Sequence, residues 1–260
     1  MCRLAAYLGP EISLETFLLK PEHSLVVQSW APRELRYAKL NADGFGIAWY
    51  APDDRPVVYV NPMPIWSDVN LHGLARTLTN DLWVASVRSA TAGFANGPAN
   101  TQPFCDDEIV FTHNGFLADF NRGLRAEFLN YLDPGFSADI RGNTDSEYLF
   151  ALLRQQLADD EATSMEAAIG EVFNLVTDWC GDREALLNLV VTDGERIYAA
   201  RHAVNHDCPS LYYTTDDERF PEGAQLVASE RLTEAEFWQP VPEHHLLILD
   251  AEQPAELLAL

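Results

Sequence analysis

Two neighbouring amphipathic helices, with strand-like segments on either side of the pair, constrain the fold of this chain most strongly. The first is expected to begin at the capping box Thr144-Asp145-Ser146-Glu147, and the second at Thr163-Ser164-Met165-Glu166. Apolar residues follow at helical spacing: Leu149, Leu152, Leu153 and Leu157 in the first helix, and Ile169, Val172, Phe173, Val176 and Trp179 in the second. The helices therefore divide the strands into two groups instead of alternating with them.

Short apolar segments bounded by turn residues predict the strands. They are residues 3–8, 44–50, 57–60, 82–90 and 108–115 before the helices, and 185–192, 196–201, 210–215, 225–229 and 245–250 after them. Gly9-Pro10 is expected to end the first strand, and Asp193-Gly194 to form a tight hairpin. Strands segregated from helices favour an α+β fold, with two sheets and the helices packed outside them. With no linker-like stretch, residues 1–260 are expected to form a single domain.

The composition excludes several classes of partner. The chain has 260 residues, and its 17 basic and 40 acidic side chains give a formal net charge of −23. This charge repels phosphate backbones and anionic lipids, so neither nucleic acid nor a membrane is expected as a partner. The four cysteines show no C-x-x-C spacing, and neither a secretory signal nor an apolar stretch of about 20 residues is present. A cytoplasmic protein is expected.

Cys2 stands directly before the first strand and is the first candidate catalytic residue. If Met1 is removed, Cys2 carries both a thiol and a free α-amino group. An α-amine titrates at about 7.7–8.0 and a free thiol at about 8.5, so the amine can accept the thiol proton without a histidine. The alternative is that a cysteine at position 2 is incidental.

Asn114-Gly115 is a candidate oxyanion hole for a thiolate that attacks an amide. The side-chain amide of Asn114 can donate a hydrogen bond, and the backbone N–H of Gly115 can be approached closely because glycine lacks a Cβ. The alternative is that Asn-Gly forms a type I′ turn.

Three further residues are candidates for holding an amino-acid head group. Arg88 ends an apolar strand, where a guanidinium can bind a carboxylate through two hydrogen bonds, and the hydroxyl of Thr91 can add a third. Asp145 can receive an α-ammonium group, although the first turn of a helix favours a carboxylate in any case. Arg88 as a solvated residue at a strand end is the competing interpretation.

Five segments in order, Cys2, "DGFG" (43–46), "VRSAT" (87–91), "THNG" (112–115) and "NTDSE" (143–147), resemble the class II glutamine amidotransferases, which are N-terminal nucleophile hydrolases. The resemblance implies a four-layer αββα sandwich and a small-molecule γ-glutamyl substrate, with no cofactor and no metal. It also implies Cys2 as nucleophile, with Asn114 and Gly115 as the oxyanion hole. Arg88 and Thr91 would then bind the α-carboxylate, and Asp145 the α-ammonium.

Within that family the chain is most similar to the stand-alone branch involved in ergothioneine biosynthesis, on segments such as "LVVQSWAPRE" and "NADGFGIAWY". This similarity implies hydrolysis of a γ-glutamyl hercynylcysteine S-oxide, with release of glutamate. Trp30, Trp49 and Trp66 are then candidates for stacking on a trimethylammonium group, or else core residues. Relatives often carry His where this chain has Ser86 and Gln102, which bears on substrate choice.

Three alternatives remain open at this stage. The chain can be a glutaminase that passes ammonia to a synthase partner, or an inactive relative that serves as a scaffold. It can also bind zinc through His202, His206 and Cys208, with His244-His245 adding a ligand. The sequence leaves open whether the chain forms a homo-oligomer.

Overall fold

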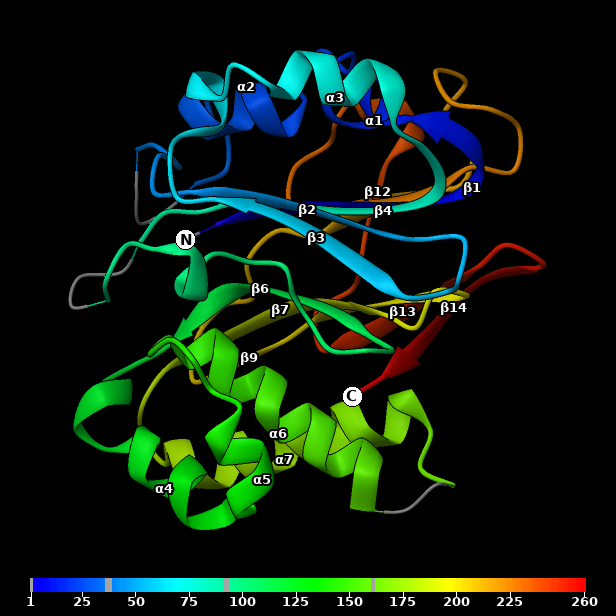
Figure 1. Cartoon of the computed structure of the whole chain (residues 1–260). Coiled ribbons are helices and arrows are strands. Elements are labelled where there is room, and N and C mark those ends of the chain that lie inside the picture. Colours follow the sequence, from blue (N-terminus) through cyan, green and yellow to red (C-terminus); the bar gives the residue numbers. More distant parts are fainter. Residues whose placement is uncertain (1, 36–38, 91–93, 160–161) are drawn as a thin grey trace.

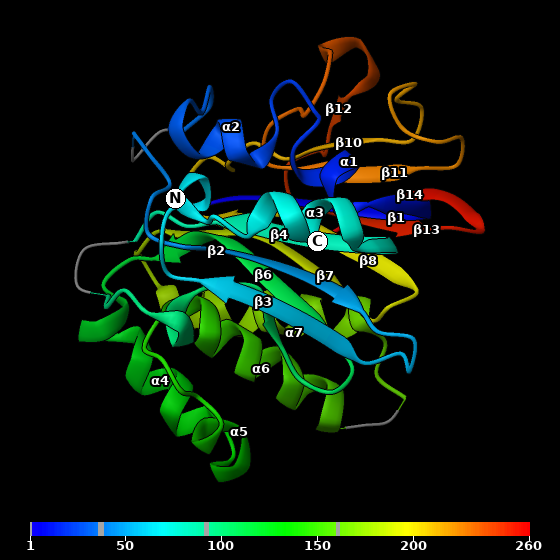
Figure 2. The same ribbon diagram turned by 45° about the horizontal axis from the view of Figure 1, so that its top comes forward.

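Two stacked β-sheets, each covered on its outer face by helices, make up the protein (Figure 1). The structure is a computed structural model and describes residues 2–35, 39–90, 94–159 and 162–260. Figure 2 shows the same four layers from a second direction. The order helices, sheet, sheet, helices confirms the αββα arrangement predicted from the sequence.

The first sheet, sheet A, contains strands from both ends of the chain. In the described residues its strand order is β12-β10-β11-β1-β4-β2-β3. Its central strand β1 pairs with β4 on one side and β11 on the other, both antiparallel. The strands are β1 (Arg3–Ser13), β2 (Phe45–Tyr50), β3 (Pro56–Asn61), β4 (Thr79–Val87), β10 (Tyr212–Thr214), β11 (Gln225–Ala228) and β12 (Gln239–Pro240).

The second sheet, sheet B, has the order β14-β13-β8-β7-β6-β5 in the described residues, with the short β9 paired to β7. The strands are β5 (Phe104–Cys105), β6 (Val110–Leu117), β7 (Ala185–Thr192), β8 (Arg196–Arg201), β9 (Ala203–Val204), β13 (His245–Asp250) and β14 (Gln253–Ala259). Strand β7 is buried along its whole length, as expected for a strand covered on both faces.

The helices form the two outer layers. Three short helices cover sheet A: α1 (Leu14–Leu18), α2 (Leu25–Trp30) and α3 (Leu71–Thr77). Four helices cover sheet B: α4 (Leu124–Tyr131), α5 (Pro134–Ala138), α6 (Asp145–Asp159) and α7 (Met165–Cys180). Single 3-10 turns lie at Ile65–Ser67, Pro98–Asn100, Phe120–Arg122 and Ala235–Phe237.

Strand alternation gives the molecule three apolar layers. Leu4, Val84 and Val110 belong to the cluster between the sheets, so the even-numbered positions of β1, β4 and β6 face inward. Tyr7 and Trp83 instead pack under the helices of sheet A, and Phe111 packs under those of sheet B. This alternation later decides on which face each candidate residue lies.

Most predicted elements are confirmed, and the differences are local. The two long helices are α6 and α7, although Ser164 and not Thr163 caps α7, because its side chain accepts from the Ala167 N–H. The first strand does not end at Gly9-Pro10. It continues to Ser13 through a register shift between Leu8 and Ile12, where a local irregularity absorbs the turn residues.

Asn114-Gly115 is not a turn but lies inside β6, paired with Asn188 and Leu187 of β7. The Asp193-Gly194 hairpin between β7 and β8 is confirmed. None of the described helices is long and apolar enough to cross a membrane.

Candidate active site

Strand register brings Cys2 and Arg88 together. Strand β1 pairs with β4 so that Arg3 lies opposite Val87, and the next position on each chain places Cys2 opposite Arg88. Both positions continue the inward-facing set, so both side chains point toward sheet B. Directly opposed residues have Cβ atoms about 4.5–5.5 Å apart. Cys2 is buried, and the N-terminal end of β1 lies between the two sheets (Figure 1).

The Arg88 guanidinium is buried and is held by neutral oxygens. Nη1 donates to the carbonyl of Asp43 at 3.3 Å and to the Asn96 side chain at 3.1 Å, and Nη2 donates to the Ala95 carbonyl at 3.3 Å. No carboxylate of the described residues forms an ion pair with it. The chain has a net charge of −23, so acidic partners are abundant. Because a buried charge without a counter-charge is costly, the arrangement indicates that Arg88 can bind an anionic ligand.

The segment before β2 shapes the other wall of this site. Asp43 accepts the Ala90 N–H at 2.8 Å through its side chain, and the Arg88 N–H donates to the Gly44 carbonyl at 2.8 Å. A Cβ at Gly46 would overlap the Gln102 carbonyl, so a glycine is required there for close approach. Gly46 of "DGFG" therefore allows β2 to pack closely against the segment that carries Gln102.

Asn114 is joined to the start of β1 through Ser229. The hydroxyl oxygen of Ser229 accepts both the Leu4 N–H at 3.1 Å and an N–H of the Asn114 amide at 3.2 Å. The second N–H of this amide has no partner among the described residues, and Asn114 Oδ1 is also unpaired. Asn114 lies on the inward face of β6, so this free donor is available to a group bound between the sheets.

Gly115 lies where no side chain fits. A Cβ there would overlap the Leu186 carbonyl and the His113 ring. His113 points to the helix side of sheet B, with Nε2 2.8 Å from the Leu186 carbonyl and Nδ1 2.9 Å from the Ser146 hydroxyl. Sequence reasoning did not single out His113, which hydrogen-bonds β6, the strand that carries Asn114 and Gly115, to β7 and α6.

Asp145 begins α6 and is buried against sheet B. Its carboxylate accepts the Leu117 N–H at 2.8 Å and its neighbour's Ser146 N–H at 2.9 Å. Burial raises the pKa of Asp145, and the nearby His113 counteracts only part of this effect. No lysine or arginine among the described residues forms an ion pair with Asp145, so a bound cation would lower its pKa again.

A hydrogen-bonded bridge connects the arginine to the helix that carries Asp145. The Asn100 amide donates to the Ala95 carbonyl, which also binds Arg88, and to Asn143 Oδ1 at 2.8 Å. The Asn143 N–H returns a hydrogen bond to Asn100 Oδ1 at 2.9 Å. Asn143 lies two residues before Asp145, so the two charges are held by one continuous network.

Gln102 hydrogen-bonds the backbone just before Asn114 and Gly115, the predicted oxyanion residues. Its carbonyl oxygen accepts from the Thr112 hydroxyl and the His113 N–H, and its amide donates to the His113 carbonyl at 3.1 Å and to Ser146 at 3.3 Å. Gln102 therefore has a structural role in the site. Ser86, the other position where relatives often carry His, is buried in β4 opposite Leu4 and Gly46.

Thr91, predicted to assist Arg88, lies outside the described residues. The structure connects the other predicted positions: Cys2 to Arg88 by register, Asn114 to β1 through Ser229, and Asp145 to Arg88 through the asparagine network. The sequence predicted the strand at residues 225–229 but not the role of Ser229 at its end. A serine beside a strand end carries no recognisable sequence pattern, so only the fold could identify it.

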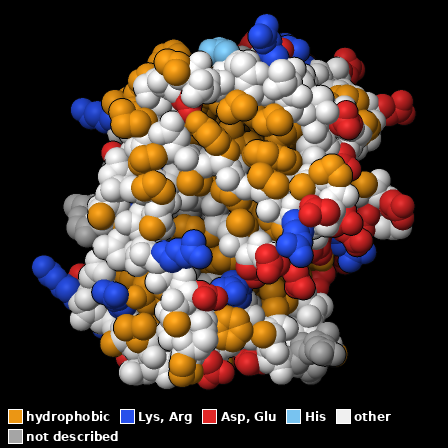
Figure 3. Space-filling view, in the orientation of Figure 1, with side chains coloured by type: hydrophobic (Ala, Val, Ile, Leu, Met, Phe, Trp, Pro, Cys, Tyr) orange, Lys and Arg blue, Asp and Glu red, His pale blue; other side chains and the backbone are white. Residues whose placement is uncertain are grey.

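A cavity of about 470 Å³ lies elsewhere, between the edge strands β3 and β5 and the helices α5 and α6. Its arginine, Arg154, is neutralised by Asp106 and Asp139 at 2.9 and 3.0 Å, in contrast to Arg88. Figure 3 shows that acidic and basic side chains are mixed on this side of the molecule. None of the predicted site residues that the structure describes lines the cavity.

Comparison with known proteins gives consistent similarities. The family model described as "Glutamine amidotransferases class-II" matches residues 19–216. The gamma-glutamyl-hercynylcysteine sulfoxide hydrolase of Mycolicibacterium smegmatis is 30% identical over 95% of this chain and 95% of its own length. The "Probable glutamine amidotransferase DUG3" of Saccharomyces cerevisiae is 29% identical over 96% of this chain and 82% of its own.

Among solved structures, a "glutamine aminotransferase class-II domain protein" from Silicibacter pomeroyi superposes with a TM-score of 0.69. It is 26% identical in sequence, and the match covers 99% of each chain. Strands, helices and layers of the present chain therefore have counterparts across the whole of that protein.

Proposed function

The chain belongs to the class-II glutamine amidotransferases, and we propose that it hydrolyses the γ-glutamyl amide bond of a small-molecule conjugate with Cys2 as nucleophile. Family and fold are those expected from the sequence motifs. The roles of the individual residues and the identity of the substrate are the content of the proposal.

The first half of the reaction forms a thioester. After removal of Met1, the α-amine of Cys2 takes the thiol proton, and the thiolate attacks the δ-carbonyl carbon of the γ-glutamyl group. The resulting oxyanion receives hydrogen bonds from the free N–H of the Asn114 amide and from the Gly115 N–H. The C–N bond then breaks, and the leaving amine departs with the proton held by the α-ammonium.

The second half of the reaction releases glutamate. The α-amine, neutral again, takes a proton from a water molecule that attacks the thioester carbonyl carbon, and the same two donors stabilise the second oxyanion. The C–S bond breaks, and the proton returns to the sulfur. The sum is one amide and one water converted to glutamate and a free amine.

The observation that supports this proposal most strongly is a pair of buried, opposite charges that lack ion-pair partners. Arg88 is bound only by neutral oxygens, and Asp145 is bound by two backbone N–H groups and the Ser146 side chain and forms no ion pair with a lysine or arginine, within the described part of the chain. An α-carboxylate and an α-ammonium on one ligand would neutralise both. The glutamyl group carries that pair and also the amide to be cleaved.

For the leaving group we propose the hercynylcysteine sulfoxide named in the mycolicibacterial relative. Support comes from the 30% identity, which extends over 95% of both chains. The yeast relative, named as a probable glutamine amidotransferase, favours glutamine as the competing substrate.

Labelling and turnover test the two parts of the proposal separately. A diazo-ketone analogue of glutamine is expected to add one label to the protein lacking Met1, and none to Cys2→Ala. Cys105→Ala is the matched control, because Cys105 is an exposed free thiol outside the site network. Label on Cys105, or undiminished turnover by Cys2→Ala in place of a loss of about 10⁴-fold or more, would refute the nucleophile.

For the substrate, glutamate release from the sulfoxide conjugate should exceed release from glutamine by at least about 100-fold in kcat/KM, equivalent to ~2.7 kcal/mol. Equal or faster hydrolysis of glutamine would assign the chain to the competing function while leaving the nucleophile intact.

Trp30 is the candidate contact for the trimethylammonium group. Of the three tryptophans proposed from sequence, Trp49 packs on Trp83 in the outer core, whereas Trp30 and Trp66 are exposed. Trp30 is the last residue of α2. The carbonyl of the preceding Ser29 accepts the Asn41 N–H, and this hydrogen bond connects the end of α2 to the segment that leads to Asp43 beside Arg88. Trp30→Ala should raise KM about tenfold for the betaine substrate only. Trp66→Ala is the control, and equal KM values for both variants would refute the contact.

A further inference from the structure

Cys2 and the predicted oxyanion residues lie on different sheets, so their relative position depends on how the sheets are joined. Cys2 precedes β1 of sheet A, whereas Asn114 and Gly115 lie in β6 of sheet B. A cluster of buried apolar side chains lies between the sheets. Apolar packing is not directional, so it does not by itself fix the direction in which the Asn114 amide points. Ser229 supplies a directional contact between the two sheets.

At Ser229 the hydrogen bonds between β1 and β11 depart from the regular antiparallel pattern. The Ser229 N–H donates to the Leu4 carbonyl at 2.9 Å, and in a regular pair the Ser229 carbonyl would accept the Leu4 N–H in return. The Ser229 hydroxyl oxygen accepts that N–H instead, at 3.1 Å, and also accepts the Asn114 amide at 3.2 Å. The Ser229 carbonyl accepts the hydroxyl of Ser210 at 2.8 Å. The serine side chain therefore joins Asn114 to a backbone N–H two residues from Cys2.

Asn188 holds the loop that carries Ser210. Its amide donates to the carbonyls of Pro209 and Ser210 at 3.3 and 3.1 Å. Asn188 also lies directly opposite Asn114 in the pairing of β6 with β7. These contacts close a ring between the two sheets, whose members are in order Asn114, Ser229, Ser210 and Asn188.

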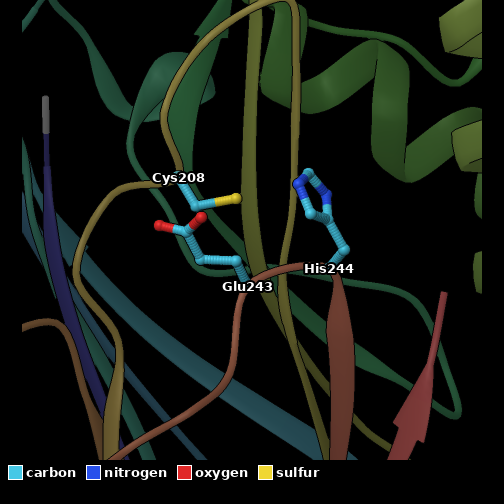
Figure 4. A group of neighbouring side chains, drawn as sticks. All are labelled: Cys208, Glu243 and His244. Atoms are coloured by element: carbon cyan, nitrogen blue, oxygen red, sulfur yellow. The ribbon is translucent and has the colours of Figure 1, made fainter.

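The same loop is anchored from its other side by Cys208. The backbone N–H of His244 donates a hydrogen bond to the Cys208 sulfur, which ties the loop to the start of β13. Figure 4 shows Cys208 beside Glu243 and His244, and the ligand atoms of these three residues lie within 4.8 Å of one another. Neither His202 nor His206, the other zinc ligands considered from sequence, belongs to this group of the described residues.

Three members of the ring are polar although they are fully buried. Asn114, Asn188 and Ser229 have essentially no exposed surface. The side-chain oxygens of the two asparagines have no hydrogen-bond partner among the described residues. Buried polar groups that are incompletely hydrogen-bonded cost free energy, so apolar side chains would give a more stable core at these positions. The polar residues therefore indicate a requirement beyond stability.

We propose that Ser229 and Asn188 are positioning residues for the hydrolysis, an inference that rests on the proposed role of Asn114 as an oxyanion donor. The Ser229 hydroxyl oxygen takes one N–H of the Asn114 amide, which fixes the amide plane and keeps the second N–H available to the oxyanion. Asn188 keeps Ser229 in place through its hydrogen bond to Ser210. Both residues act through Asn114 and not by contact with the reacting atoms.

A double-mutant cycle between Ser229 and Asn114 tests the proposal, with kcat measured on the faster of the two candidate substrates. Ser229→Ala should lower kcat about 30-fold, and Asn114→Ala about 10²–10³-fold. Because Ser229 acts through Asn114, kcat of the double variant should lie within about threefold of that of Asn114→Ala. KM should change less than about threefold in each variant. Iodoacetamide should alkylate Cys2 at the wild-type rate in Ser229→Ala, as measured by mass spectrometry of the Cys2 peptide.

Variants of Asn188 and Ser210 extend the test. Asn188→Leu removes the donors to the loop at nearly constant volume and should lower kcat about tenfold, and Ser210→Ala should lower it about threefold. Ser210→Thr, which keeps the hydroxyl at a half-buried position, should restore kcat. Thr192→Val is the matched control and should keep the wild-type kcat, because the buried Thr192 hydroxyl accepts the Gly194 N–H at the far end of the same strand. Circular dichroism checks that each variant is folded, and if Ser229→Ala is not, the cycle is run with Ser210→Ala.

Two results would overturn the proposal. One is a loss of kcat from Ser229→Ala that is as large in the Asn114→Ala background as in the wild type. The other is a wild-type kcat in both Ser229→Ala and Asn188→Leu. A wild-type kcat in Asn114→Ala would instead contradict the oxyanion donor of the proposed function, and this inference with it, so the two failures can be told apart.

Discussion

Two buried arginines, Arg3 and Arg88, lie on opposite faces of sheet A near the N-terminal end of β1, and their surroundings differ. Arg3, on the helix side, lies 3.5 Å from the buried carboxylate of Glu230. Arg88, on the side facing sheet B, has only neutral oxygen partners among the described residues. Since a buried charge is costly unless it is neutralised, Arg3 already has its counter-charge in Glu230, although its guanidinium forms no hydrogen bond with the described residues, whereas the proposed function supplies a counter-charge for Arg88 through a bound anion.

Glu230 makes the contrast sharper. His23 Nε2 lies 2.7 Å from its carboxylate, and the N–H groups of Arg33 and Glu34 donate to it at 2.8 and 3.0 Å. Asp145, which we propose to bind the α-ammonium group, accepts two backbone N–H groups and forms no ion pair with a lysine or arginine of the described residues. We therefore expect Arg3 and Glu230, which pair with each other, to stabilise the folded protein. Arg88 and Asp145, which lack ion-pair partners, are expected to bind the substrate.

The largest effect is expected for Asp145→Asn. Loss of the carboxylate should lower kcat/KM for γ-glutamyl substrates about 10³-fold, because truncating one partner of a buried charge pair costs roughly 4 kcal/mol. The free energy of unfolding should fall by only about 1 kcal/mol, since the amide oxygen can still accept the Leu117 N–H, the Ser146 N–H loses its acceptor, and no ion pair with a lysine or arginine is lost. Steady-state kinetics and urea unfolding measure the two quantities.

A substrate analogue without the α-amino group supplies the control for Asp145→Asn. The wild type should hydrolyse this analogue as poorly as the variant hydrolyses the full substrate, and the variant should barely distinguish the two compounds. If the variant keeps the wild-type preference for the amino group, Asp145 does not bind it and the contrast with Glu230 fails.

Glu230→Gln is expected to lower the stability of the protein and to leave its activity nearly unchanged. The amide nitrogen cannot accept the hydrogen bonds that the carboxylate accepts, and Arg3 is left without a counter-charge, so the free energy of unfolding should fall by about 3 kcal/mol. Activity per folded molecule should remain near that of the wild type. Glu234→Gln is the matched control, because this exposed carboxylate pairs with Arg219 on the surface and should change stability by less than about 1 kcal/mol.

The pH dependence of stability separates the ion pair from simple packing at Glu230. Burial alone would raise the pKa of Glu230, but hydrogen bonds from His23, Arg33 and Glu34 and the charge of Arg3 outweigh it and lower that pKa. A lowered pKa in the folded state stabilises the protein above the pKa of unfolded glutamate, about 4.3, and the stabilisation is lost as pH falls below it.

The difference in unfolding free energy between wild type and Glu230→Gln should therefore be constant from about pH 8 to pH 6. It should decrease as the pH falls below about 4.3, where Glu230 becomes protonated. Urea midpoints measured by tryptophan fluorescence at each pH give this difference. A difference that is flat down to the acid transition would show that the glutamine variant is destabilised by shape and not by loss of charge.

Sequence alone singled out the groups that we propose to react with or bind the substrate better than the groups around them. Cys2, Arg88 and Asn114 could be singled out because strand alternation and short motifs are local properties of the chain. Ser229 and the Asn100–Asn143 pair could not, because they reach the site through contacts between residues 43 to 225 positions apart. Such contacts exist only after the sheets have formed.

The same distinction applies to the fold. The buried strands and the two long helices have strong apolar periodicity, and these were predicted. The edge strand β14 was not, because it is mostly exposed and contains Pro254, which normally argues against a strand. Helices α4 and α5 are short and carry few buried residues, so their helical state depends on packing against α6 and α7.

The smallest effect is expected at Gln102, which touches neither arginine. Gln102→Leu keeps the volume and removes the hydrogen bonds that fix the His113 backbone, one residue before the oxyanion donor. We expect kcat to fall about tenfold, equivalent to ~1.4 kcal/mol of oxyanion stabilisation, with KM unchanged because Arg88 and Asp145 are intact.

The matched control is Gln225→Leu, which replaces a buried glutamine whose amide donates to the Asp250 carbonyl at the far end of β1. Both variants should lose about 1 kcal/mol of stability, but Gln225→Leu should keep its kcat. If kcat falls equally in both, Gln102 acts through general stability, and the placement of Asn114 does not depend on it.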